Sequence, residues 1–354
     1  MTCIEEIIES RANNTTASLL PRLLPPQSNH FPYSIHIILI ILYLITISIS
    51  VVANALLPYI VIFKKKERKS FDYLLVNLCL AHFIATVFVI PYVFIHDVGE
   101  VVSERYRNVT CVFTEALRVF FIACGVSLIM LCVISYVRVI GAMFPHKIHL
   151  KMSKLVAIVI NVISWIGLIA TMLPSIMSIT YFPEVQMCFQ DLESVGMVIK
   201  PITYRMWQLC VSLILPLLWV FASYASIRRA LTKQRTVRLS VHVERKAEGQ
   251  HLRKASTLLG YQILTLCIGW FPFMTYWFIY AATDLIQNSC QSQVSSMKWH
   301  RIAILFGVIN AAADPLIYLV GVNENKKLVC ETFRKVLFFK KSSKTGSIPL
   351  QVKV

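Results

Sequence analysis

Three ionisable side chains stand inside long apolar stretches of this sequence, where their chemistry would be unusual. His82 lies in NLCLAHFIATVFVIP, Arg138 in LCVISYVRVIGAMF and Asp314 in VINAAADPLIY. An imidazole changes charge near neutral pH, and a charged group among apolar neighbours is costly unless it finds a partner or reaches water. These residues are therefore candidates for a functional site, although a lone buried histidine is often a structural group with satisfied hydrogen bonds.

No catalytic motif accompanies these residues. The chain has no phosphate-binding glycine loop, no HExxH metal pair and no Gly-x-Ser-x-Gly nucleophile turn. We therefore expect no enzymatic activity, no cofactor and no bound metal.

The apolar residues form blocks that can cross a lipid bilayer. The chain is 56% hydrophobic and 15% charged, with a mean hydropathy of +0.65. The blocks match the roughly 20 residues that span the hydrocarbon core and are too long for β-barrel strands. They lie at approximately 34–63, 71–96, 111–140, 153–179, 203–228, 255–283 and 300–320. This pattern predicts an all-α fold: an N-terminal tail (1–33), a bundle of seven transmembrane helices (34–320), and a short amphipathic helix with a cytoplasmic tail (321–354).

Basic residues indicate the orientation of the bundle. Of the 35 Lys and Arg residues, 25 fall in the regions 64–69, 147–154 and 228–254 and in the tail from Lys326. All four regions lie on one side of seven spans, and the positive-inside rule makes that side cytoplasmic. We expect a multi-pass plasma-membrane protein with its N-terminus outside. The net charge of +17 then reflects contact with the lipid bilayer, and nucleic-acid binding is the disfavoured reading of a basic chain.

Glycosylation motifs and cysteines agree with this orientation. Asn-X-Thr motifs begin at Asn13, Asn14 and Asn108, all on the predicted outside. The N-terminus has no basic region followed by an apolar one, so we expect no cleaved signal peptide. Four cysteines also fall outside, where oxidising conditions favour disulfides. They are Cys3, Cys111, Cys188 and Cys290.

Every predicted helix carries polar, proline or tryptophan residues at distinctive spacings. In chain order these are Asn54; Asn77, Leu78, Ala81 and Pro91; Ser135, Arg138 and Pro145; Trp165 and Pro174; Pro216 and Tyr224; Trp270 and Pro272; and Pro315 and Tyr318. In this order they resemble the landmarks of the rhodopsin-like family of G-protein-coupled receptors, from about residue 34 to 338.

The resemblance implies a receptor whose sixth helix swings outward at its cytoplasmic end when ligand binds. Such receptors activate heterotrimeric G proteins, and arrestin is a further possible partner. Proline removes a backbone donor and kinks a helix, so the bundle has places to bend, although such kinks can also be static. The residues that the resemblance assigns to this switch are Arg138, Tyr224, Trp270, Pro272, Asp314, Pro315 and Tyr318.

The cytoplasmic switch motif departs from the family pattern. Val137-Arg138-Val139 stands in place of the usual Asp-Arg-Tyr, and the sixth helix begins with basic residues at 253–254 where many relatives carry an acid. The ion pair of the resting state therefore cannot form in the usual way, and we expect raised activity without ligand. The alternative is a receptor that has lost G-protein coupling, although the other switch residues are retained.

Five polar residues should converge in the middle of the bundle, by their positions in the family. They are Asn54, His82, Ser127, Asn310 and Asp314. In most relatives the residue at the position of His82 is an Asp that holds a sodium ion, and an imidazole lacks the anionic oxygen that sodium prefers. One interpretation is a pH-responsive His82–Asp314 couple whose receptor is insensitive to sodium. The other is a purely structural histidine.

The resemblance also implies covalent features. Cys111 and Cys188 match the disulfide that ties the second outer loop to the third helix. Cys3 and Cys290 could form a second disulfide, since sequence alone does not fix connectivity. Cys330, on the amphipathic helix, is a candidate for palmitoylation, and an unmodified thiol is the alternative.

Family ligands bind between the outer halves of helices 2, 3, 5, 6 and 7. The matching positions are Tyr92, His96, Phe120, Phe121, Cys124, Arg205, Gln208, Phe273, Trp277, His300 and Arg301. Phe120 stands where amine receptors carry Asp, so a monoamine has no charge partner, and Val308 stands where retinal would be linked to Lys. Arg205, His300 and Arg301 favour an anionic or polar small molecule, unless they face lipid headgroups. A peptide is equally compatible, because the second outer loop alternates like a strand.

We therefore interpret the chain as a rhodopsin-like receptor that transmits the binding of an extracellular ligand to G proteins by helix rearrangement. A receptor-like protein that binds without signalling is one alternative. A seven-span transporter is another, although few polar residues lie mid-span to line a path.

Overall fold

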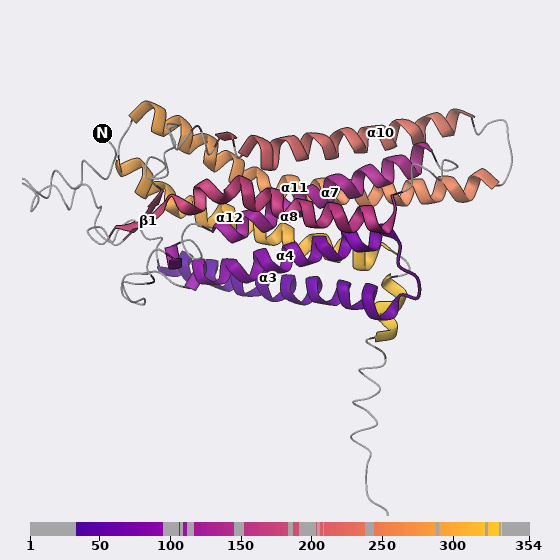
Figure 1. Cartoon of the computed structure of the whole chain (residues 1–354), viewed down its shortest axis with the longest axis horizontal. Coiled ribbons are helices and arrows are strands. Elements are labelled where there is room, and N and C mark those ends of the chain that lie inside the picture. Colours follow the sequence, from indigo (N-terminus) through magenta and orange to yellow (C-terminus); the bar gives the residue numbers. More distant parts are fainter. Residues whose placement is uncertain are drawn as a thin grey trace, which may run out of the picture.

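The computed structural model is a bundle of long helices that run side by side along its long axis (Figure 1). It describes residues 33–94, 106, 109–111, 117–144, 152–182, 187–190, 203, 206–207, 209–237, 244–287, 290–322, 325–332 and 334, and for some residues in these ranges it describes the backbone alone.

Six of the described helices are long and apolar enough to cross a membrane. The helical elements are α3 (Tyr33–Tyr59), η2 (Ile60–Lys64), α4 (Ser70–Phe94), α7 (Arg118–Met143), α8 (Lys154–Met177), η6 (Cys210–Ile214), α10 (Leu215–Val237), α11 (Glu244–Gln287) and α12 (Cys290–Gly321). The π-helical turn η6 and helix α10 occupy the place of the fifth predicted segment. The prediction of an all-α helix bundle is confirmed.

Several helix boundaries differ from those predicted by hydropathy, the start of three helices among them. Helix α11 begins at Glu244 instead of 255, and α12 begins at Cys290 instead of 300. Hydropathy marks only the part of a helix that suits hydrocarbon, and these helices continue with more polar residues. Helix α7 begins at Arg118 instead of 111, because Leu117 precedes it with a left-handed φ of 47°, a conformation that interrupts a right-handed helix.

Prolines shape several helices. The π-helical turn η6 ends two residues before Pro216. Proline lacks the amide that would donate to the preceding turn, and a wider turn accommodates that loss. Further prolines lie inside other helices, at Pro58 in α3, Pro91 in α4, Pro174 in α8, Pro272 in α11 and Pro315 in α12.

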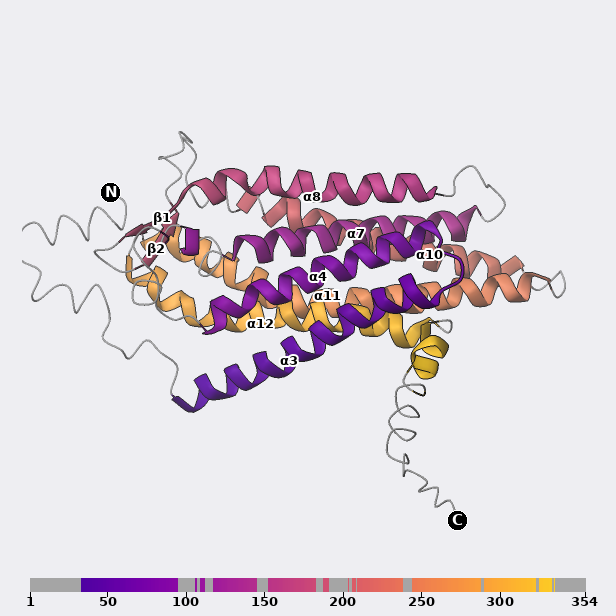
Figure 2. The same cartoon turned by 60° about the horizontal axis from the view of Figure 1, so that its bottom comes forward.

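Helix α7 lies at the centre of the bundle. It contacts α4, α8, α10 and α11. In its most apolar stretch 67% of the residues are buried, compared with 17% in the corresponding stretch of α3. Figure 2 shows α3 and α8 at opposite edges of the bundle. Large apolar side chains such as Ile38, Ile45 and Ile166 are exposed on these two helices. An apolar exterior of this kind suits a lipid environment.

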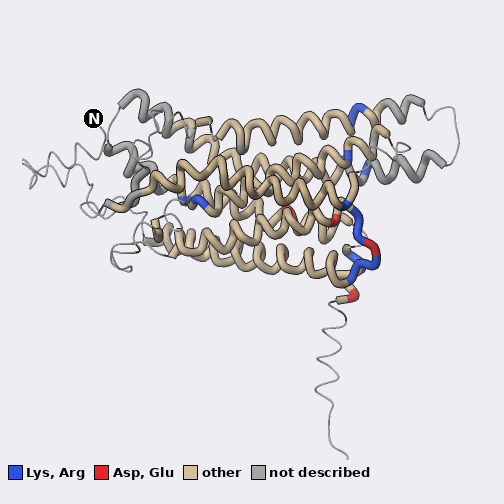
Figure 3. The backbone as a smooth tube through the Cα atoms, viewed as in Figure 1, with Lys and Arg blue, Asp and Glu red and all other residues tan. Residues whose placement is uncertain are grey.

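The two ends of the bundle differ in structure and charge. At one end, β1 (Ile179–Phe182) and β2 (Met187–Gln190) form an antiparallel hairpin, as the alternating sequence there predicts. At the other end lie most of the described Lys and Arg residues, including the connection 64–69 (Figure 3). We call these the hairpin end and the basic end.

A further helix follows α12 at the basic end, over residues 325–332. Leu328 and Val329 pack against the bundle core, whereas Lys326 and Lys327 are exposed. The side-chain amide of Asn325 donates to the backbone oxygen of Tyr318 at 3.2 Å. This helix is therefore amphipathic, as predicted, and is attached directly to the end of α12.

Candidate functional site

Helix α12 carries a residue of each of three polar or aromatic clusters. His300 lies toward the hairpin end, Asp314 in the middle and Tyr318 toward the basic end. A helix rises 1.5 Å per residue, so His300 and Tyr318 are about 27 Å apart along the axis. Each cluster also includes a side chain of α11, namely Tyr276, Thr265 and Gln262 in the same order.

The first cluster surrounds His300. Its Nδ1 is hydrogen-bonded to the hydroxyl of Tyr92 at 2.9 Å, so α4 and α12 are joined. The rings of Tyr276 and Phe273, both from α11, lie 5.2 and 6.2 Å from the imidazole. The guanidinium of Arg301 lies 5.9 Å over the ring of Tyr92. An imidazole and a guanidinium are thus held by aromatic rings near the hairpin end.

Aromatic side chains continue this cluster toward the middle of the bundle. The Phe273 ring lies 5.3 Å from the ring of Phe121, which lies 5.3 Å from that of Phe120. Trp270 meets Phe273 edge-on at 5.7 Å. Phe120 and Trp270 are buried, as is the free thiol of Cys124 one turn below Phe120. The structure therefore connects the predicted ligand positions on α7, α11 and α12 through continuous ring contacts.

Several predicted ligand positions lie outside the described residues: His96, Arg205, Gln208 and the side chain of Trp277. Conversely, sequence reasoning missed Tyr276 and Tyr43. The Tyr43 hydroxyl donates to the backbone oxygen of Arg301 at 2.6 Å and attaches α3 to this cluster. Among so many membrane aromatics, nothing in the sequence distinguishes these two.

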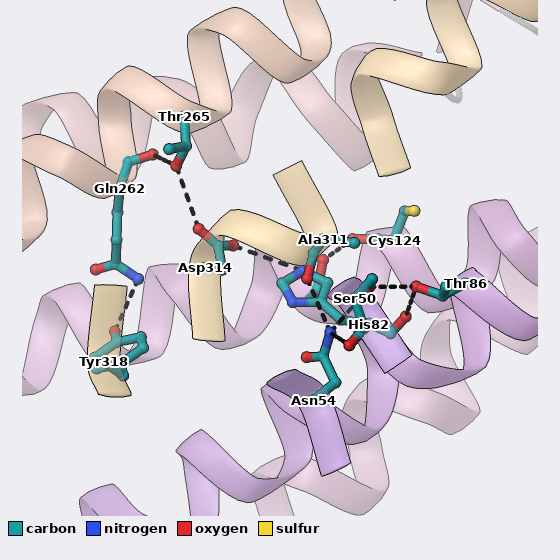
Figure 4. Close-up of polar contacts among 11 residues, drawn as sticks. Ser50, Asn54, His82, Thr86, Cys124, Gln262, Thr265, Ala311, Asp314 and Tyr318 are labelled. Atoms are coloured by element: carbon teal, nitrogen blue, oxygen red, sulfur yellow. Dashed lines mark hydrogen bonds and ion pairs between the residues drawn. The ribbon is translucent and has the colours of Figure 1, made fainter. Parts of the chain in front are cut away.

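The second cluster pairs His82 with Asp314 in the middle of the bundle (Figure 4). His82 Nε2 and Asp314 Oδ2 are 3.6 Å apart, and both side chains are enclosed, at 1% and 0% exposure. Thr265 of α11 donates to the other carboxylate oxygen at 3.3 Å. Among the described residues, neither imidazole nitrogen nor Asp314 Oδ2 has a hydrogen-bond partner. The histidine and the acid therefore face each other as an enclosed pair that no described hydrogen bond joins.

Asn54 supports this cluster from α3. Its side-chain amide donates to the backbone oxygens of Ser50 and Ala311, each at 2.9 Å, which joins α3 to α12. Ser50 is hydrogen-bonded to Thr86, whose hydroxyl donates to the backbone oxygen of His82 (Figure 4). Three helices are thus linked around the His82–Asp314 pair.

Two residues of the predicted polar core take other contacts. The Ser127 hydroxyl donates to the backbone oxygen of Cys124 in its own helix. Asn310 faces Gly269 of α11, where an added Cβ would lie 2.6 Å from the Asn310 Cβ. Neither has a described hydrogen bond to His82 or Asp314, so the five predicted residues converge only in part.

The third cluster surrounds Arg138 near the basic end. Its guanidinium lies over two rings, 5.4 Å from Tyr318 and 5.6 Å from Phe71. Its Nη1 donates to the side-chain oxygen of Gln262 at 3.3 Å. The same amide donates from Nε2 to the Tyr318 hydroxyl at 2.8 Å. Aromatic faces and an amide therefore stabilise a charge that has no carboxylate neighbour in the described part of the chain.

Tyr224, the third predicted switch residue of this region, contacts α11 by packing. An added Cβ on Gly260 would lie 3.5 Å from its ring. No described hydrogen bond joins Tyr224 to Arg138. Helix α10 is held to α7 nearby, where Ser135 donates to the Ser223 hydroxyl at 3.2 Å.

Sequence reasoning missed Gln262, Thr265 and Phe71. The first two could have been recognised, because they are polar residues three apart in the apolar stretch LLGYQILTLCIGW and so share a helix face. Phe71 has no such signal. Of the remaining predicted switch residues, Trp270 and Pro315 are buried and Pro272 is half-buried.

The covalent predictions are only partly within the described residues. Cys111 is disulfide-bonded and packs with Ile179 and Tyr181 of the hairpin. Tyr181 is paired in register with Cys188, whose side chain is not described, so the Cys111–Cys188 bond stays a prediction. Cys330 is exposed. Outside the described residues lie Cys3, Asn13, Asn14, Asn108 and the side chain of Cys290.

Comparison with known proteins supports one assignment. No curated protein matches the chain. The family model of the 7 transmembrane receptor (rhodopsin family) matches residues 53–318, which include the three clusters apart from Tyr43 and Ser50. With the apolar helices, this makes the chain a multi-pass membrane protein of a receptor family. The chain belongs to the rhodopsin family of seven-transmembrane receptors.

Proposed function

We propose that this protein is a plasma-membrane receptor that transmits binding of an extracellular ligand to cytoplasmic G proteins. The observation that carries the proposal is the repeated contact between α11 and α12. The two helices meet through Tyr276 and His300, through Thr265 and Asp314, and through Gln262 and Tyr318. A contiguous chain of packed and hydrogen-bonded groups is a physical route for coupling distant sites.

The orientation follows from charge. The basic end faces the cytoplasm, where Lys and Arg accumulate in membrane proteins, and the hairpin end faces outside. At the basic end the receptor meets the G protein, and arrestin is a second partner for the same face. The exposed Lys326 and Lys327 also suit the anionic lipids of the inner leaflet.

The cluster around His300 supports an anionic or polar ligand. Arg301 supplies a permanent charge beside Tyr92, and guanidinium groups pair well with carboxylates and phosphates. The rings of Phe121, Phe273 and Tyr276 offer apolar faces for the rest of the ligand. A peptide with an acidic group fits the same chemistry. A monoamine does not, because Phe120 is an apolar residue at the centre of this region.

The test is G-protein dissociation in cells that express the wild-type chain at graded surface levels, measured for each Gα class. The proposal expects dissociation of at least one class to rise with receptor level without added ligand. A receptor-like binder that does not signal would show no rise for any class at any level.

Raised activity without ligand should depend on the missing acid beside Arg138. Val137 is half-buried against the core, so Val137→Asp places a carboxylate next to the guanidinium without entering the bundle centre. We expect ligand-independent dissociation to fall by roughly two- to fivefold, the range of a partly exposed ion pair. Val137→Asn, of similar size and uncharged, is the control. Equal activity of the Asp and Asn variants would contradict this explanation.

A further inference from the structure

Among the described residues, Arg138 lacks the carboxylate partner that a guanidinium inside a membrane protein usually requires. Among the described residues the ion pairs are Lys65–Asp72 and His82–Asp314, and neither includes Arg138. The contacts that Arg138 does make come from α4, α11 and α12, namely Phe71, Gln262 and Tyr318. Of these, Gln262 accepts the one described hydrogen bond from Arg138.

Gln262 uses both ends of its amide between helices. Its oxygen accepts from Arg138 of α7, and its nitrogen donates to the hydroxyl of Tyr318 of α12. The side chain is fully enclosed, as is Tyr318. Direct contact between α7 and α11 is otherwise sparse. One amide therefore joins three helices at the level of the predicted switch.

The neighbouring turn of α11 extends the same polar face. Thr265 donates to the backbone oxygen of Gln262 at 3.0 Å and to Asp314 at 3.3 Å. Gln262 and Thr265 are thus consecutive polar contacts of α11 with α12 (Figure 4). Displacement of α11 would break the contacts of both residues, and the buried groups left behind would be unsatisfied.

We infer that the Gln262 bridge, the contact Arg138–Gln262–Tyr318, holds α11 against α7 and α12 in the resting receptor and stands in for an ion pair. The inference deepens the proposed function and rests on it for its signalling consequence. Its structural consequence does not depend on signalling. We call α11 closed when its basic end packs against α7 and α12, and open when that end has moved away from them. Breaking the bridge should shift the equilibrium between these two arrangements by roughly tenfold, as expected for one hydrogen bond to a charged group.

Two substitutions distinguish a bridging role of Gln262 from a role in packing alone. Gln262→Met keeps the length and volume and removes both hydrogen bonds. Gln262→Glu keeps the acceptor for Arg138, adds charge to it, and can accept from the Tyr318 hydroxyl. A bridging role predicts that Glu keeps α11 closed and Met opens it. A packing role predicts the opposite order, because a buried carboxylate is costly where no bond compensates for it.

The experiment measures the distance between spin labels on α7 and α11 by double electron–electron resonance. Met143→Cys and Thr257→Cys provide exposed attachment points near the basic end, in a background where the exposed thiols among the described residues are removed by Cys210→Ser and Cys330→Ser. The expected result is a longer and broader distance distribution for Gln262→Met, and an unchanged one for Gln262→Glu. Gln262→Asn, whose amide is too short to span both partners, should resemble Met.

Thr275→Val is the control, because this exposed threonine of α11 bonds only to its own helix. Unchanged distances in both Met and Asn variants, or a shift in the Glu variant alone, would overturn the inference. G-protein dissociation is measured in parallel. Longer distances without any change in dissociation would support the bridge and count against the proposed signalling function instead.

Discussion

His82→Leu is expected to lower the free energy of unfolding by about 3 kcal/mol, the cost of leaving one member of a buried pair without its partner. The substitution leaves the enclosed carboxylate of Asp314 with Thr265 as its described hydrogen-bond partner. The double variant His82→Leu/Asp314→Leu should recover most of this loss, because an apolar pair of similar volume needs no hydrogen bonds.

The measurement is thermal unfolding followed with a thiol-reactive fluorescent dye. Cys79 and Cys124 are free and buried, so they react only when the bundle opens. Replacing the exposed Cys210 and Cys330 by Ser lowers the background signal. A double variant as unstable as His82→Leu would show that the two residues do not interact. His82 would then be an independent structural group.

Gly269→Ala is expected to destabilise the receptor by about 2 kcal/mol, as overpacking does in a well-filled core. The new Cβ would lie 2.6 Å from the Cβ of Asn310 and 3.1 Å from the backbone oxygen of Phe306. Both atoms belong to α12 and cannot yield without moving that helix. Small residues permit such close helix approach in membranes, so α11 and α12 should separate where the clusters join them.

Gly167→Ala in α8 is the matched control, since an added Cβ there meets nothing within 4 Å. That substitution should be neutral or slightly stabilising, because Ala favours helix more than Gly. The same dye-based unfolding midpoint compares the two variants. If both shift the midpoint equally, close contact at Gly269 is not what holds α11 to α12.

Hydropathy alone was enough to predict the helix bundle, because lipid allows little else to span it. It could not predict that α11 starts at Glu244, since that part of the helix is polar and carries no membrane signal. Nor could it predict the interruption before α7, which depends on the backbone of Leu117. Family landmarks indicated which residues matter but not how far each helix continues.

The site was predicted in part. The family positions of His82 and Asp314 predicted that the two side chains would meet, and His82 Nε2 lies 3.6 Å from Asp314 Oδ2. The family position of Ser127 did not indicate that its hydroxyl would donate to the backbone oxygen of Cys124 in its own helix. A serine in a helix can donate to a nearby backbone oxygen whatever its other neighbours are. Gln262 was not predicted because the family pattern indicates an acid at one position of the sixth helix as the partner of Arg138. Buried amides can serve the same purpose without charge.

The Gln262 bridge also refines the expectation of raised basal activity. A hydrogen bond from a guanidinium to a neutral amide is weaker than one to a carboxylate, because in the second case both groups are charged. On this inference, the resting state would be restrained by a weaker contact than an ion pair. Basal signalling should lie between that of a receptor with an intact ion pair and that of one with no contact to Arg138.

G-protein dissociation by the wild-type chain against Arg138→Ala, at matched surface expression and across the Gα classes, tests the central proposal most directly. Arg138 joins the rings of Phe71 and Tyr318 to the amide of Gln262, where the basic end would meet a G protein. We expect wild type to activate at least one class. Arg138→Ala also breaks the Gln262 bridge, but it should lose roughly nine-tenths of that activity because the charged contact between Arg138 and the G protein is removed. Equal activity of the two chains, or none from wild type in any class, would contradict a receptor that signals through this cluster.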